Sequence, residues 1–142
     1  LLIGNQIIAA PYIRQSGIES LPTGYMLIDS GKPTTASYMS GSMPIPHHKS
    51  EIAACTAMAG EMLGLSLIYM DGGSGADQTV STQMVSTVAE NVSNPLIIGG
   101  GIKSAEVAKQ ICEAGATVVV VGNATEKNPE ILSEIAEAIH SL

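Results

Sequence analysis

Three stretches of this sequence follow one plan, in which an apolar run stops and a glycine-rich or polar loop begins at once. They are "LIYMDGGSGAD" at 67–77, "PLIIGGGIKS" at 95–104 and "TVVVVGNATE" at 117–126. Continuous apolar runs of this length are typical of parallel strands that are covered on both faces. Because the carboxyl ends of parallel strands meet at one edge of a sheet, the repeated junction predicts a shared site there.

Between these runs the apolar residues recur at helical spacing. We expect strands at 23–29, 65–70, 96–98 and 117–121, and helices at 1–16, 50–63, 81–92 and from 104 to about 112. A last helix should open at Asn128-Pro129, with proline at its first position. The alternation predicts an α/β fold, either half of an eight-stranded (β/α) barrel or a small doubly wound sheet.

Two segments carry more specific expectations. The pattern over 50–63 predicts a buried helix face, made of Ile52, Cys55, Thr56, Ala59, Met62 and Leu63. The segment 30–48, "SGKPTTASYMSGSMPIPHH", is rich in Pro, Gly, Ser and Thr and predicts no regular element beyond a short edge piece. Its His47-His48 pair has no acid or cysteine at ligand spacing, which favours solvated loop residues over a metal site.

Composition limits the classes of function. The chain of 142 residues is 45% hydrophobic and 13% charged, which suits one ordinary domain with a buried core. Its net charge is −7 with only six Lys and Arg, so nucleic acid is not an expected partner. A single phosphate can still bind, because backbone N–H groups at a loop or helix start hold an anion without lysine.

The second and third junctions predict such a phosphate site. The proposed donors are the backbone N–H groups of Gly100, Gly101, Gly122 and Asn123, because in barrels the loops after the last two strands often form one phosphate cradle. The alternative is a pair of plain strand-to-helix turns. A dinucleotide fingerprint fits poorly, since the third glycine of the pattern is replaced by Ser104.

The first junction predicts the chemistry. Tyr69 and Asp71 are two residues apart in a strand and therefore point to the same face. An acid at the carboxyl end of a barrel strand has the position where barrel enzymes keep catalytic groups. The alternative is that Asp71 only caps the glycine loop through a local hydrogen bond.

Together these motifs resemble those of the geranylgeranylglyceryl phosphate synthases and the related heptaprenylglyceryl phosphate synthases. The resemblance rests on "YMDGGSGA", "IIGGGIKS" and "VVVGN", with "ESLPTGYMLID" and "EIAACTAMAGEMLGL" in the same order, and it covers essentially the whole chain. It implies a (β/α)8 TIM-type barrel. Residues 1–142 would be the C-terminal part of this single domain, with strands five to eight and their helices.

The resemblance also implies a function. It is Mg²⁺-dependent prenyl transfer, in which sn-glycerol 1-phosphate attacks a long polyprenyl diphosphate and diphosphate leaves, as a step of ether lipid synthesis. Asp71 and Tyr69 would be the catalytic residues, although the family usually has Glu at the position of Asp71. The glycerol phosphate pocket would comprise Tyr69, Met70, Asp71, Gly72, Gly73, Ser74, Gly75, Gly100, Gly101, Gly122 and Asn123.

The Mg²⁺ ligands are expected on strands that precede this chain, so no metal ligand is expected within it. A cytoplasmic homo-oligomer with at most transient membrane-surface contact is expected. Two alternatives remain open, another phosphate-binding barrel enzyme such as a sugar-phosphate isomerase, and a non-catalytic half-barrel that only binds.

Overall fold

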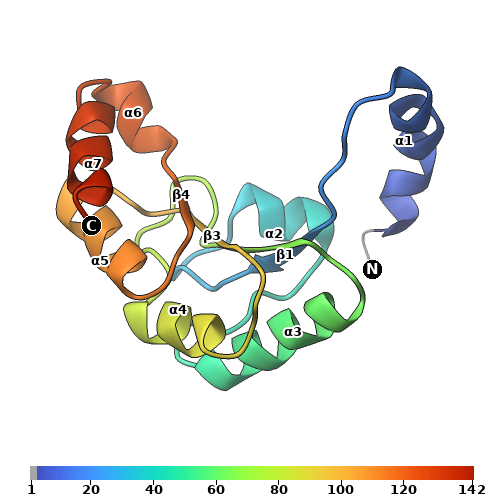
Figure 1. The fold of residues 1–142 in the computed structure, drawn as a ribbon, viewed down its shortest axis with the longest axis horizontal. Coiled ribbons are helices and arrows are strands. Elements are labelled where there is room, and N and C mark those ends of the chain that lie inside the picture. The colour runs from blue at the N-terminus through green and yellow to red at the C-terminus, as the bar shows by residue number, and fades with distance from the viewer. Residues whose placement is uncertain (1–2) are drawn as a thin grey trace.

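The centre of the molecule is a parallel sheet of four strands, which lie in chain order β1-β2-β3-β4 (Figure 1). The computed structural model describes residues 3–142. The strands are β1 (Thr23–Leu27), β2 (Leu67–Asp71), β3 (Leu96–Gly99) and β4 (Val118–Val120). The four predicted strands and their parallel direction are confirmed. The strand order never reverses, which separates this sheet from a doubly wound one.

Three helices cover one face of the sheet, α3 (Ser50–Met62), α4 (Thr82–Ala89) and α5 (Ala105–Glu113) (Figure 1). Strand residues on this face alternate with those on the other, so every second side chain enters the main core. The core comprises Met26, Ile28, Ala53, Ala54, Ala57, Ile68, Met70, Val80, Met84, Val85, Val88, Leu96, Ile98 and Ile111. A smaller cluster around Ile102, Ala108 and Ile135 joins α5 to α7 (Ile131–His140).

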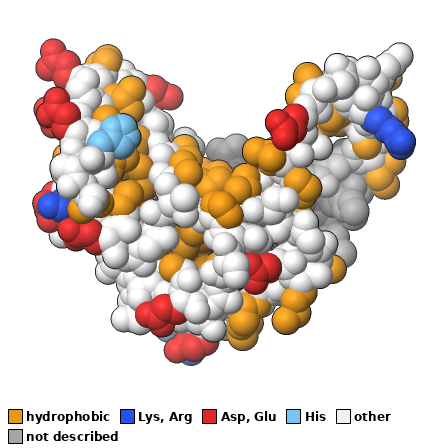
Figure 2. Space-filling model, in the orientation of Figure 1, with side chains coloured by type: hydrophobic (Ala, Val, Ile, Leu, Met, Phe, Trp, Pro, Cys, Tyr) orange, Lys and Arg blue, Asp and Glu red, His pale blue; other side chains and the backbone are white. Residues whose placement is uncertain are grey.

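The opposite face of the sheet is more open. Its first row in register is Tyr25, Tyr69, Ile97 and Val118, and its second row is Leu27, Asp71, Gly99 and Val120. The side chains of Val118 and Val120 are 45% and 41% exposed. Figure 2 shows hydrophobic side chains in the hollow over the strands. Helices α6 and α7 border this hollow on one side, and helix α1 borders it on the other. The expectation that strand 117–121 is covered on both faces is therefore wrong for β4 within residues 3–142.

The predicted inner face of α3 is also wrong. The helix buries its small residues, including Ala53, Ala57 and Gly60, while Met62 and Leu63 are more than four-fifths exposed. A Cβ on Gly60 would lie 3.3 Å from the side chain of Leu65 and 3.4 Å from that of Ile68. The helix lies so close to the sheet that only short side chains fit between them. The prediction had instead placed the larger apolar side chains on the buried face.

Two short helices occur where none was predicted. Helix α2 (Thr35–Ser40) lies in the segment expected to be irregular. Thr34 caps it, with Ser37 completing a capping box, and Gly41 ends it in the left-handed conformation with φ of 61°. Helix α6 (Asn123–Lys127) directly follows Gly122. Because of it, the last helix begins at Ile131, two residues after Pro129, which lies in the preceding turn.

Helix α1 (Ile3–Ser16) projects from the rest of the chain (Figure 1). Residues 1 and 2 of the predicted helix lie outside the described residues. The apolar side chains Ile7, Ile8 and Tyr12 are each about 70% exposed or more. Among the helices described within residues 3–142, none has the length and apolar character needed to cross a bilayer.

Candidate active site

The three glycine junctions meet at the carboxyl edge of the sheet. Strand register places Asp71 beside Gly99 and Gly99 beside Val120, at the ends of β2, β3 and β4. The loops that follow enclose a pocket of about 180 Å³. Its lining residues are Tyr69, Asp71, Gly73, Ser74, Gly100, Val120, Gly122 and Asn123. All but Val120 belong to the predicted set of site residues.

Four other predicted residues lie elsewhere. Gly75 and Gly101 line an adjoining cavity of about 290 Å³, together with Lys103 and Lys127. The Gly72 N–H donates to the carbonyl oxygen of Gly99 at 2.9 Å and so extends the sheet by one bond. The Met70 side chain is fully buried in the core on the helix-covered face. That side chain does not line the pocket, because neighbours along a strand point to opposite faces.

Asp71 is held by two hydrogen bonds. One carboxylate oxygen, Oδ1, accepts from the Gly73 N–H at 2.7 Å, and the other, Oδ2, accepts from the Tyr25 hydroxyl. The first bond is the local loop cap that the sequence offered as an alternative. The carboxylate also lines the pocket, so the cap and a direct role at the site are compatible.

Tyr25 and Tyr69 flank the carboxylate from adjacent strands. Their rings meet edge to face, with centroids 5.1 Å apart and planes at 83°. Burial raises the pKa of the Tyr25 hydroxyl, and the hydrogen bond to Asp71 and the charge of Asp71 raise it further. Burial and the Asp71 charge raise the pKa of Tyr69 as well. Both hydroxyls therefore stay protonated at neutral pH, and the Tyr25 hydroxyl donates to Asp71.

Gly100 allows the second junction to approach the first. Its φ is 82°, a conformation that favours glycine. A Cβ at this position would lie 2.6 Å from the Gly73 nitrogen and 2.9 Å from Asp71 Oδ1. The absence of a side chain thus lets the β3–α5 loop pass directly against the carboxylate and its cap.

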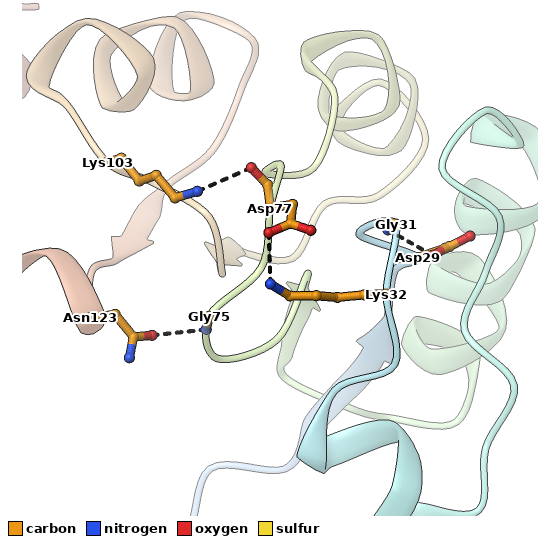
Figure 3. Close-up of polar contacts among 7 residues, drawn as sticks. All are labelled: Asp29, Gly31, Lys32, Gly75, Asp77, Lys103 and Asn123. Carbon is orange, nitrogen blue, oxygen red and sulfur yellow. Dashed lines mark hydrogen bonds and ion pairs between the residues drawn. The ribbon is translucent and has the colours of Figure 1, made fainter.

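The third junction reaches back to the first. Asn123 Oδ1 accepts from the Gly75 N–H at 2.9 Å (Figure 3). The same oxygen accepts from the Ser74 hydroxyl at 3.1 Å. Asn123 is the first residue of α6, whose opening N–H groups point out of the helix end. The side chain of Asn123 therefore serves the loop, and its backbone N–H remains the predicted anion donor.

Sequence reasoning missed Tyr25, the second hydrogen-bond partner of Asp71. A signal for it was present, because the dipeptide Tyr-Met occurs in two predicted strands, at 25–26 and 69–70; a third copy, at 38–39, lies in the segment expected to be irregular. The structure pairs Tyr25 with Tyr69 and Met26 with Met70 in register. Aligning the two strands on this dipeptide would have placed both tyrosines on the face of Asp71.

A magnesium site does not fit the residues at hand. Within residues 3–142 there is no group of three or more His, Cys, Asp or Glu side chains that could hold a metal ion together. Asp71, the carboxylate of the pocket, already accepts hydrogen bonds at both oxygens.

The sequence of this chain is similar to those of curated proteins that share one name. It is 54% identical over 138 residues to geranylgeranylglyceryl phosphate synthase of Spirosoma linguale, covering 97% of this chain and 55% of the relative. With the Chitinophaga pinensis protein of that name the identity is 52% over 141 residues, or 99% of this chain and 56% of the relative. The chain thus spans a little over half the length of these curated relatives.

The fold of this chain also matches a solved structure. The (S)-3-O-geranylgeranylglyceryl phosphate synthase of Thermoplasma acidophilum, crystallised with its substrate sn-glycerol-1-phosphate, superposes with a TM-score of 0.93 at 31% identity. The match covers 99% of this chain and 57% of that protein. The sequence profile of the PcrB family matches residues 2–139. The chain belongs to the PcrB family.

Proposed function

We propose that the protein containing this chain is a prenyltransferase. It joins sn-glycerol 1-phosphate to a long polyprenyl diphosphate of the geranylgeranyl type through an ether bond, and diphosphate leaves, as a step of ether lipid synthesis. The observation that carries the proposal is the pocket in which Asp71 and Tyr69 face the glycine loops of two neighbouring strands. The relatives named geranylgeranylglyceryl phosphate synthase support the same reaction.

The phosphate of the glycerol substrate binds to backbone N–H groups. Gly100 and Gly101 supply donors from the second junction, and Gly122 and Asn123 supply donors from the third. Gly122 leads directly into α6, whose first backbone N–H groups have no acceptor within the helix and can donate to an anion. The similar Thermoplasma acidophilum enzyme was crystallised with sn-glycerol-1-phosphate, which supports the assignment of this substrate.

Asp71 orients and deprotonates the attacking hydroxyl. The 3-hydroxyl oxygen of the glycerol forms a bond to the first carbon of the prenyl chain, while the bond from that carbon to diphosphate breaks. The hydroxyl proton passes to Asp71. Tyr25 does not accept this proton, because its raised pKa keeps the hydroxyl protonated and donating to Asp71. The cap from the Gly73 N–H fixes the carboxylate plane during the attack.

The proposal includes Mg²⁺, which neutralises charge on a leaving diphosphate when it is bound. Residues 3–142 offer no cluster of side chains that could hold the ion. We propose that its ligands, and the contacts to the diphosphate, lie in the rest of the whole protein.

The proposed fold of the whole protein is a (β/α)8 barrel, with this chain as strands five to eight. Four parallel strands in chain order and helices on one face are what half of such a barrel requires. The open face with Tyr25, Val118 and Val120 would then face the barrel interior. A cytoplasmic homo-oligomer that touches the membrane surface only transiently completes the proposal.

A direct assay tests the function. The full-length protein is incubated with labelled sn-glycerol 1-phosphate, Mg²⁺ and polyprenyl diphosphates of several lengths, and the ether product is extracted. We expect product with at least one chain length and none with the enantiomeric sn-glycerol 3-phosphate. If no chain length gives product while a sugar phosphate is isomerised, the prenyltransferase assignment is wrong.

A further inference from the structure

The loop that follows β2 is held by side chains from the segments that follow β1, β3 and β4. Holding the loop in one conformation should affect how tightly the substrate binds. Residues 72–78 have no regular structure and include Gly73 and Gly75, both with positive φ. A glycine-rich loop loses much conformational freedom when it becomes ordered. If this loop were ordered only by the substrate, that loss would weaken binding.

The first contact comes from the start of α6, just after β4. Asn123 Oδ1 accepts hydrogen bonds from the Gly75 N–H and the Ser74 hydroxyl, at 2.9 and 3.1 Å. These two bonds connect residues that are 48 and 49 positions apart in sequence. They fix the middle of the loop, which borders the pocket through Ser74.

The other two contacts hold Asp77, near the end of the loop. Lys32 Nζ lies 2.7 Å from Asp77 Oδ1, and Lys103 Nζ donates to the Asp77 carbonyl oxygen at 3.1 Å. Figure 3 shows Lys103 and Asn123 approaching the loop from one side and Lys32 from the other. The two lysines therefore hold one residue through its side chain and its backbone.

Lys32 has its place because of a turn after β1. Asp29 Oδ1 accepts from the Gly31 N–H at 3.0 Å, and this bond turns the chain just before Lys32 (Figure 3). Gly31 has a φ of 93°, which the turn requires. Lys32 also lowers the pKa of Asp77, through its hydrogen bond first and its charge second, so Asp77 is ionised and paired at neutral pH.

We infer that Lys32, Lys103 and Asn123 are positioning residues, which hold the 72–78 loop in its substrate-binding conformation before the glycerol phosphate arrives. The inference rests on the proposed function for its substrate. It assigns these side chains no contact with the reacting atoms. Because the side chains of Lys32 and Asp77 are 47% and 65% exposed, their ion pair should contribute little to global stability, so its effect should be local.

Hydrogen exchange of the ligand-free, full-length protein tests the holding of the loop. We expect amides of residues 72–77 to exchange about two- to fivefold faster in Lys32→Met, and about tenfold faster in Asn123→Ala, which loses two bonds. Lys32→Arg should restore the slow exchange. Lys109→Met is the matched control, because Lys109 also forms an exposed ion pair, with Glu113, but on α5.

Steady-state kinetics supply a second readout. Lys32→Met and Asn123→Ala should each raise KM for sn-glycerol 1-phosphate by a factor similar to their effect on exchange. Neither should change KM for the polyprenyl diphosphate. Unchanged loop exchange, or an equal rise of both KM values, would overturn the inference. A wild type without prenyltransferase activity would instead refute the proposed function, and the exchange measurement would still decide whether these side chains hold the loop.

Discussion

Met70 and Asp71 are neighbours in β2, yet they lie in opposite surroundings. Met70 is fully buried among the helices α3, α4 and α5, and Asp71 lines the pocket on the other face. The same contrast holds for Ile68 and Tyr69. Volume and shape decide which residues fit on the helix-covered face, as the small residues of α3 show. On the pocket face, hydrogen bonds and charge decide. Substitutions on the two faces should therefore separate stability from activity.

The largest expected effect is on the pocket face. Asp71→Asn removes the charge but keeps the size, and the amide can still accept from the Gly73 N–H. We expect kcat/KM of the full-length enzyme to fall by about 10²- to 10⁴-fold, the range for loss of a general base. Unfolding in urea should give nearly the wild-type free energy. Product formation at the wild-type rate would show that Asp71 acts only as the cap of its loop.

The next effect is on the helix-covered face. Met70→Ala leaves a cavity in the core, so we expect the free energy of unfolding to fall by about 2–5 kcal/mol. The protein that remains folded at low temperature should keep most of its kcat/KM, because the Met70 side chain does not line the pocket. Loss of activity without loss of stability would contradict the assignment of the two faces.

A smaller effect sharpens the contrast within the pocket face. Tyr25→Phe removes the hydroxyl that donates to Asp71 and keeps the ring against Tyr69. One such hydrogen bond contributes about 1 kcal/mol, so we expect kcat/KM to fall by about fivefold to tenfold. Tyr38→Phe is the control, because Tyr38 is exposed on α2. Equal effects of both changes would remove Tyr25 from the site.

The sequence predicted the sheet and its direction better than the buried face of α3. Parallel strands follow from apolar runs between helical patterns, and the site edge follows from where those runs stop. The buried face of α3 was mispredicted because close packing selected Ala53, Ala57 and Gly60 over the larger Met62 and Leu63. Such a choice depends on the distance between helix and sheet, which local pattern does not contain.

The site residues that stand within one junction were predictable from the sequence. The residues that reach the site from distant segments were less predictable. Tyr69, Asp71 and the glycines stand in recognisable junctions. Lys32 and Tyr25 reach the same loop and carboxylate from β1 and its following turn, more than forty residues away. Their contacts depend on strand register and on the turn at Gly31. The Tyr-Met dipeptide shared by β1 and β2 indicated this register, but a third copy at 38–39 lies outside the sheet, so the dipeptide alone does not select it.

The smallest expected effect is a fall in the free energy of unfolding at high pH. The pKa of Tyr25 is raised in the folded protein, so the folded state keeps this proton where the unfolded chain, with a pKa of about 10, begins to lose it. The unfolded state is then favoured, and stability should fall as pH rises above about 10. Tyr69 shifts in the same direction and leaves part of the slope in a Tyr25 variant. Urea unfolding of wild type and Tyr25→Phe between about pH 9 and pH 11 measures the difference. We expect a shallower fall in the variant. Equal falls in the two proteins would mean that folding does not raise the pKa of Tyr25 in solution, and the contrast between the two faces would then rest on Asp71 alone.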